Sequence, residues 1–248
     1  MESPPAPVRG MTEIIRGIRK GHLVITGQTQ YGKTTGALYF FLNEKLFDGR
    51  SNPTHIFLDT KHDDNILPHG FLAQNKEDLE FHLENSAKRI VYRVPRITIP
   101  ELKRHLNDIV NTLFMFREKK KRMSPYLLFI DEVQMYAKKQ EGHDGLLRLS
   151  TTGAGKKIYA VILGQRLQDI HEQTLSQCNL RMTYFMQEDP AYLKRRGMSD
   201  LVSWMPWLKA NRYYFAYDTG AESGWRLHAP VPLPPKPIDP YDPKFAPP

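Results

Sequence analysis

The sequence predicts an α/β protein built on a mostly parallel sheet with helices on both faces. Short apolar runs rich in β-branched and aromatic residues, typical of buried strands, recur along the chain. Proline-free segments with apolar residues three or four positions apart, typical of helices, separate most of these runs. Strands that alternate with helices favour parallel crossover connections. A glycine-containing loop joins the first strand to the first long helix, which is where such sheets often bind ligands.

Length, charge and cysteine content narrow the class of protein. The 248 residues suit one α/β domain with a tail, and 40% hydrophobic with 25% charged residues is ordinary for a globular chain. The formal net charge of +8 favours a polyanionic partner. Cys178 is the only cysteine, which excludes a disulfide within one chain and favours a reducing cytoplasm. With no long apolar run and no signal-peptide pattern, we expect an intracellular protein without a transmembrane segment.

The first half of the chain alternates strand and helix. Each predicted strand is a short apolar run, and each predicted helix has apolar side chains on one face. Pro95 stops one strand, and Pro100 can open the longest helix. In chain order we predict a short helix at 11–19, strand 22–26, helix 34–46, strand 54–59, helix 77–85, strand 89–94 and helix 101–121.

The second half begins with the most apolar run, Tyr126–Ile130, which predicts a central strand buried on both faces. The closing segments 212–217 and 224–228 flank a turn and predict a hairpin. Between them we predict helix 145–150, strand 159–163, strand 181–186 and a short helix at 192–196.

These elements divide the chain into three segments. Residues 1–20 are predicted to form a proline-rich N-terminal arm and the short helix, and residues 21–228 form the α/β domain. Nine of the last twenty residues are proline. Residues 229–248 are therefore predicted to be an extended polyproline tail, either a disordered end or an arm that lies on a neighbouring subunit or partner.

The loop after the first strand matches the phosphate-binding pattern GxxxxGK[ST] at every constrained position. Gly27 and Gly32 allow backbone conformations that turn consecutive N–H groups inward, toward a phosphate. Lys33 then places a charge between the β- and γ-phosphates of ATP, and the Thr34 hydroxyl can coordinate Mg²⁺. The predicted nucleotide-binding residues are Gly27, Gln28, Thr29, Gln30, Tyr31, Gly32, Lys33, Thr34 and Thr35.

Two other predicted strands end in residues that suit ATP hydrolysis, and the carboxyl ends of parallel strands share one edge of a sheet. Asp131 can hold Mg²⁺ together with Thr34, directly or through water. Glu132 can accept a proton from the attacking water. Gln165 ends the strand at 159–163, where its amide can sense the γ-phosphate or help to place the water.

Phosphoryl transfer often also uses an arginine from a neighbouring subunit. Arg148, Arg166 and Arg181 are the candidates, and each can also be an ordinary surface charge. We choose Arg148 as the first candidate because it lies on a short predicted helix beyond Glu132, where a subunit edge is plausible.

The order GQTQYGKTT, HIFLDTK, YLLFIDEVQ and KKIYAVILGQRLQDI, from about Gly21 to Arg196, resembles the FtsK–HerA superfamily of DNA-pumping ATPases. The compact size is similar to the genome-packaging ATPases of tailless, internal-membrane viruses of archaea and bacteria. The resemblance implies an ASCE-type P-loop ATPase domain at 21–228. It also implies the roles given above to Lys33, Thr34, Asp131, Glu132 and Gln165.

The resemblance further implies a ring, with a hexamer expected, that hydrolyses ATP to move double-stranded DNA into a preformed capsid. The expected setting is the host cytoplasm, with attachment to the virion, a capsid vertex or a membrane protein left open. Asp59 matches an acidic position of the superfamily, although a strand-end cap explains it equally well. The chain has 153–157 (GAGKK) where the superfamily often has an Arg-Gly-Arg stretch, which leaves Lys156 or Lys157 as substitutes for the arginine.

Two basic clusters, 117–122 and 194–196, are candidate DNA contacts or solvated helix ends. No base-reading module is visible, so DNA contact is expected to be largely independent of sequence. The alternatives are a Zot-like ATPase of phage assembly or secretion, a P-loop kinase for a small molecule, and a nucleotide-switched binding protein. The acidic pair Asp131–Glu132 favours hydrolysis over the last two.

Overall fold

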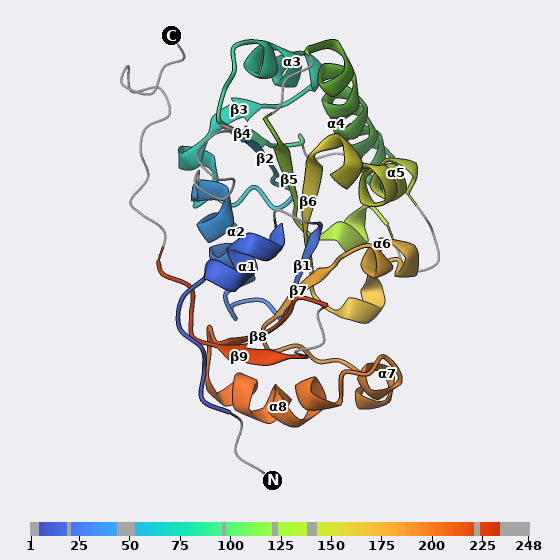
Figure 1. Ribbon diagram of the computed structural model, residues 1–248. Coiled ribbons are helices and arrows are strands. Elements are labelled where there is room, and N and C mark those ends of the chain that lie inside the picture. The colour runs from blue at the N-terminus through green and yellow to red at the C-terminus, as the bar shows by residue number, and fades with distance from the viewer. Residues whose placement is uncertain are drawn as a thin grey trace.

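A computed structural model describes residues 5–18, 21–43, 53–95, 98–120, 124–137, 143–220 and 224–233. Nine strands of this part form a single sheet (Figure 1). The strands are β1 (Leu23–Thr26), β2 (Thr54–Leu58), β3 (Phe71–Ala73), β4 (Arg89–Tyr92), β5 (Tyr126–Ile130), β6 (Ile158–Gly164), β7 (Leu180–Thr183), β8 (Phe215–Asp218) and β9 (Arg226–His228).

The strand order in the sheet is β3-β4-β2-β5-β6-β1-β7-β8-β9. All neighbours from β3 to β7 pair in parallel, and only β7–β8 and β8–β9 are antiparallel. The predicted mostly parallel α/β fold and its C-terminal hairpin are therefore confirmed. Residues 234–248, most of the predicted polyproline tail, lie outside the described residues.

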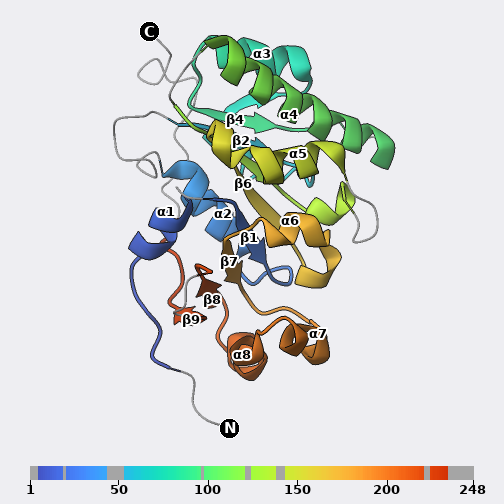
Figure 2. The ribbon, with the colours of Figure 1, turned by 45° about the vertical axis from the view of Figure 1, so that its right-hand side comes forward.

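Helices cover both faces of the sheet, as predicted (Figures 1 and 2). One face packs against α1 and α2 through side chains such as Leu127 and Phe129 of β5. The other face packs against the remaining large helices through the alternate residues Leu128 and Ile130. The helices are α1 (Thr12–Ile18), α2 (Lys33–Leu42), α3 (Lys76–Glu84), α4 (Ile99–Lys120), α5 (Asp144–Thr152), α6 (Glu172–Ser176), α7 (Pro190–Arg195) and α8 (Ser199–Ala210).

Four of these strands and helices differ from the prediction. Helix α6 was not predicted, because five residues are too few to show a helical pattern. Strand β3 was not predicted, because three residues are too few to show a periodic pattern. Helix α8 was not predicted either, since Pro206 lies inside it and proline normally ends a helix. The strand predicted at 181–186 stops at Thr183, because the next residues leave the sheet to pack around the phosphate-binding loop, where Phe185 O accepts from Gln28 N at 2.7 Å.

The N-terminal segment is tied to the last strand of the sheet. Val8 pairs with β9: Val8 N donates to Leu227 O and Ala229 N donates to Val8 O, both at 2.9 Å. Glu13 of α1 forms an ion pair with Arg226 at 3.0 Å. The described helices include none that is both long enough and apolar enough to cross a membrane.

Two buried histidines make stability depend on pH. Burial lowers the pKa of His22 and of His55 from 6.5 to about 4. Below pH 6.5 the unfolded chain binds protons that the folded chain excludes, so the free energy of unfolding falls as the pH drops from 6.5 to 4. We expect a loss of about 3 kcal/mol per histidine, measured by urea unfolding across this range.

The His55→Asn variant is the matched control. An asparagine amide can replace the Nδ1 donor that lies 2.6 Å from Phe41 O, but it does not titrate. The variant should lose less stability between pH 6.5 and 4 than the wild type does. An identical pH dependence in both proteins would contradict the assignment to His55.

Candidate nucleotide-binding and hydrolysis site

The predicted phosphate-binding loop and the predicted residues Asp131, Glu132 and Gln165 meet at one edge of the sheet, because the strands that precede them are parallel and in register. Strand β6 lies between β1 and β5, with Thr26 beside Gly164 and Ile130 beside Ile162. The phosphate-binding loop, the Asp131–Glu132 pair and Gln165 all follow directly from these strand ends. The sheet therefore brings together residues that are more than a hundred positions apart in the sequence.

The glycines of the loop adopt backbone conformations that the pattern requires. Gly27 has φ 152° and Gly32 has φ 108°, both in the region that favours glycine. A Cβ at Gly27 would lie 2.7 Å from the Tyr184 Cβ, and one at Gly32 would lie 3.1 Å from the rings of Tyr184 and Tyr213. Gly32 also caps α2 without a side-chain hydrogen bond, so the first N–H groups of the helix are directed toward an incoming ligand.

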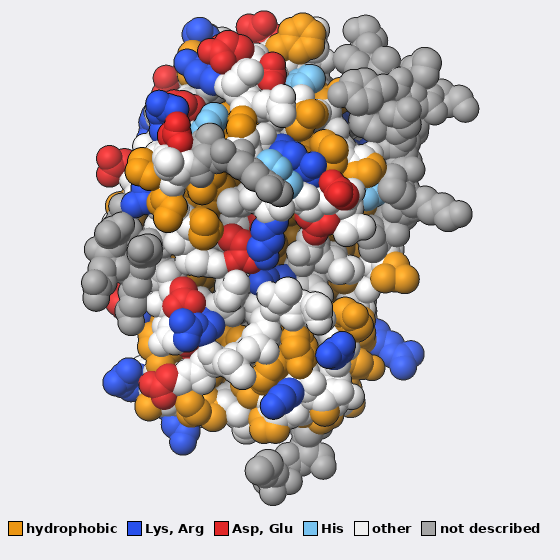
Figure 3. Space-filling view, turned by 180° about the vertical axis from the view of Figure 1, so that it is seen from behind, with side chains coloured by type: hydrophobic (Ala, Val, Ile, Leu, Met, Phe, Trp, Pro, Cys, Tyr) orange, Lys and Arg blue, Asp and Glu red, His pale blue; other side chains and the backbone are white. Residues whose placement is uncertain are grey.

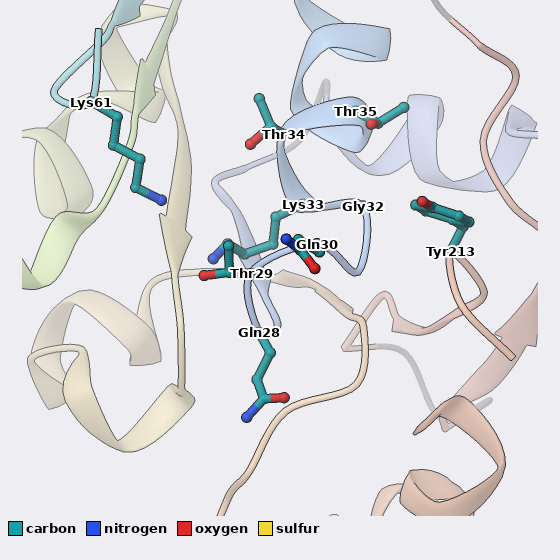
Figure 4. Close-up of a pocket in the computed structure, with 9 residues that line it drawn as sticks. All are labelled: Gln28, Thr29, Gln30, Gly32, Lys33, Thr34, Thr35, Lys61 and Tyr213. Carbon is teal, nitrogen blue, oxygen red and sulfur yellow. The ribbon is translucent and has the colours of Figure 1, made fainter. Parts of the chain in front are cut away.

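A pocket of about 280 Å³ opens above this loop (Figure 4). Seven of the nine residues predicted to bind the nucleotide line it. Tyr31 does not: its ring packs on Phe185, with 4.9 Å between the centroids. Gly27 acts through the backbone turn described above. The lining residues are Gln28, Thr29, Gln30, Gly32, Lys33, Thr34, Thr35, Lys61 and Tyr213.

Lys33 is a buried cation that lacks a hydrogen bond. Its side chain is 5% exposed, and within the described part of the chain Nζ has no hydrogen-bond partner. The nearest carboxylate oxygen, Glu132 Oε1, is 3.9 Å away. Burial lowers the pKa of Lys33, and the charge of Glu132 opposes that shift. A buried ammonium in this state fits an anionic ligand, and a triphosphate above the glycine cradle supplies one.

The Glu132 carboxylate contacts two lysines and two glutamines. Its carboxylate forms ion pairs with Lys33 and Lys61, and it accepts from the amides of Gln134 and Gln165, the latter at 3.4 Å. Burial opposes its ionisation, but Lys61 and Lys33 hold the pKa of Glu132 below its usual range. The residue has φ 47° and ψ 55°, a left-handed conformation that is uncommon outside glycine and frequent at functional sites.

Asp131 lies one residue earlier and is buried at the same edge. Its Oδ1 accepts from Glu132 N at 3.0 Å, and burial raises the pKa of Asp131 to about 6, with Lys61 opposing the shift. The Thr34 hydroxyl lines the pocket. One carboxylate and one hydroxyl, completed by phosphate oxygens and water, are the oxygen donors that Mg²⁺ prefers, so these residues fit the predicted metal.

Sequence reasoning missed two residues that line the pocket. Lys61 follows β2, which pairs with β5, and this pairing brings the Lys61 ammonium to Glu132. The position of Lys61, directly after a predicted strand that ends in an acidic residue, is the local pattern from which it could have been predicted. Tyr213 lies between α8 and β8. No local pattern pointed to it, because only the packing of the C-terminal segment on the loop places it there.

The three candidate arginines have partners within the chain. Arg148 donates to Asn111 Oδ1 at 2.8 Å and stacks over the Phe114 ring at 4.1 Å. The other two form ion pairs: Arg166 with Asp169 at 2.9 Å and Arg181 with Asp218 at 3.9 Å. None of the three lines the pocket of the same chain, so an arginine acting on a neighbouring subunit stays a prediction.

Asp59 has a structural partner. Its fully buried side chain accepts from Arg93 at 2.8 and 3.0 Å and from Asp63 N at 3.1 Å. These contacts fix the turn that leads to Lys61. These contacts are those of a strand-end cap, which is one of the two interpretations given for Asp59 above.

No protein-family model matches the sequence, and a search of curated proteins also finds no match. Among solved structures, the chain is similar to the genome packaging NTPase B204 from Sulfolobus turreted icosahedral virus 2 in complex with ATP-gammaS. The TM-score is 0.66 at 17% identity, over 86% of this chain and 99% of that chain. A second structure, described as B204, the DNA-packaging ATPase from Sulfolobus Turreted Icosahedral Virus, gives 0.65 at 16% identity, over 86% and 98%.

The chain is also similar to EssC (ATPases 2 and 3) from Geobacillus thermodenitrificans, with a TM-score of 0.52 at 11% identity, over 88% of this chain and 41% of that chain. Thermomonospora curvata EccC (ATPases 2 and 3) gives 0.52 at 13% identity, over 85% and 38%. At these identities the likeness is one of fold. It confirms the predicted resemblance at that level: the chain has the P-loop ATPase fold shared by a viral genome-packaging NTPase and by EssC and EccC.

Proposed function

We propose that the chain is an ATP-hydrolysing motor that moves double-stranded DNA, and that it packages a viral genome into a preformed capsid in the host cytoplasm. The observation that supports this most is that Lys33 and Gln165 both contact the Glu132 carboxylate at the sheet edge, beside the phosphate-binding loop. A cation for the phosphates, a carboxylate for the water and an amide beside it are the parts that hydrolysis needs. The similarity in fold to B204 supports DNA as the substrate of the motor.

The contacts of Glu132 suggest how this proposed general base is held before ATP binds. In the structure its carboxylate is neutralised by Lys61 and Lys33. The γ-phosphate carries more negative charge than one carboxylate, so both lysines have a stronger partner once ATP is in the pocket. Glu132 is then free to accept a proton from water, with the Gln165 amide holding that water. Thr34 and Asp131 would hold Mg²⁺, which would supply positive charge to the phosphate oxygens.

One face of the molecule shows, among the described residues, no single basic patch that would mark a DNA-binding site (Figure 3). On the face shown in Figure 3, basic side chains are dispersed among acidic and apolar ones. Within the cluster 117–122, the Arg117 guanidinium forms a hydrogen bond inside the chain, to Ser124 O at 2.5 Å. Residues 121 and 122 of this cluster lie outside the described part. Lys194 and Arg195 are exposed at the end of α7. We therefore propose that the DNA path forms between subunits of a ring, with a hexamer expected.

The test is ATP hydrolysis by the full chain with and without long linear double-stranded DNA, together with a mass measurement in the presence of nucleotide. We expect DNA to raise the hydrolysis rate, added salt to remove this stimulation, and nucleotide to favour a ring. Stimulation by a polypeptide instead would favour a protein-directed motor, which the likeness to EccC in complex with a signal sequence peptide makes the second candidate. Transfer of phosphate to a small acceptor would favour a kinase.

A further inference from the structure

Two residues outside the phosphate-binding loop line the pocket, and they lie at its opposite ends. Figure 4 shows Lys61 on one side of the loop and Tyr213 on the other, with Gly32 and Thr35 next to Tyr213. The Lys33 amine points toward the side of Lys61. Lys61 and Lys33 both pair with Glu132, so the Lys61 end is where a terminal phosphate and its attacking water belong.

This polarity determines where the rest of a nucleotide must lie. The α-phosphate and the nucleoside extend away from the terminal phosphate, toward Thr35 and the aromatic ring beyond it. We propose that Tyr213 is the nucleoside-binding residue of the pocket and that its ring stacks on the base. This inference rests on the proposed function, because it takes the ligand to be a nucleoside triphosphate.

The backbone and the exposure of Tyr213 are unusual for a residue that only stabilises the fold. Its φ is 71°, a strained conformation for a bulky residue, and such strain often accompanies ligand-binding positions. Tyr213 as a residue is 50% exposed, although it is a large hydrophobic side chain that would usually be buried. Two residues later, the Phe215 ring is fully buried and lies 5.4 Å from Tyr184. The chain is therefore firmly packed just after the exposed tyrosine.

The loop and the C-terminal segment also contact each other beside Tyr213. The Arg212 guanidinium lies over the Tyr31 ring at 5.7 Å, and the Tyr213 ring edge is 3.1 Å from the position a Gly32 Cβ would take. These contacts hold the ring against the loop while leaving it at the mouth of the pocket. Stacking uses the π-face that every base has, so we expect ATP and GTP to bind with similar affinity.

The experiment separates the nucleoside contact from the phosphate contact. We would measure the affinity of the full chain for ATP and for inorganic tripolyphosphate, which has no nucleoside, by calorimetry. The variant is Tyr213→Asn, since asparagine tolerates a positive φ and has no ring. It should weaken ATP binding by about tenfold and leave tripolyphosphate binding unchanged. Tyr213→Phe, which keeps the ring, should retain wild-type affinity for both ligands.

Two results would overturn the proposal. If Tyr213→Asn weakens ATP and tripolyphosphate equally, the ring only supports the loop through Gly32. If ATP affinity does not change, the base lies elsewhere. Failure of the proposed function has a different signature: a wild-type chain that binds ATP more tightly than tripolyphosphate but does not hydrolyse it would refute the motor and leave the assignment of Tyr213 intact.

Discussion

A Glu132→Gln variant is expected to bind ATP at least as tightly as the wild type while hydrolysing it about a hundredfold to ten-thousandfold more slowly. The amide cannot accept a proton from water, yet it keeps the size and hydrogen-bonding groups of the side chain. Binding is preserved because the substitution also removes a carboxylate that competes with the γ-phosphate for Lys33 and Lys61. Single-turnover hydrolysis and equilibrium binding of ATP, measured on the same preparation, separate the two effects.

The matched control is Glu80→Gln on α3. Glu80 also forms an ion pair with a lysine, Lys76 at 3.6 Å, but it does not line the pocket. This control should hydrolyse ATP at the wild-type rate. If Glu132→Gln turned ATP over as fast as the control, Glu132 would not be the general base.

The second large effect is expected at Lys33. Removal of its ammonium by Lys33→Met should weaken ATP binding by about a hundredfold or more, because the β- and γ-phosphates lose a buried charge-assisted contact. The stability of the empty protein should not fall. Lys33 Nζ is buried and, among the described residues, lacks a hydrogen bond, so replacing it with an apolar side chain of similar length removes an unfavourable burial.

Thermal unfolding with and without ATP measures both parts of this prediction. The wild type should gain stability as ATP is added, because a ligand that binds only the folded state raises the unfolding temperature. The Lys33→Met variant should start at the same or a higher temperature and show almost no gain. An ATP-dependent gain equal to that of the wild type would exclude Lys33 from phosphate binding.

Much of the fold followed from local patterns. The strand at Tyr126–Ile130 was placed at its observed bounds because five consecutive apolar residues require burial on both faces. The phosphate-binding loop was predictable because Gly27 and Gly32 occupy conformations that other residues rarely adopt. By contrast, β3 is too short to show a pattern, and α8, for which no element is predicted, contains a proline, which is uncommon inside a helix.

The sequence by itself determined the α/β class, the loop that can hold phosphates and the acidic pair that follows a central strand, since each depends on residues close together in the chain. Only the tertiary structure decided that Lys61 pairs with Glu132 and that Tyr213 closes the other end of the pocket. The first contact needs β2 beside β5, and the second needs the segment after α8 to pack on Gly32. Such long-range neighbours arise from strand order and helix packing, which depend on burial across the whole chain and not on any local pattern.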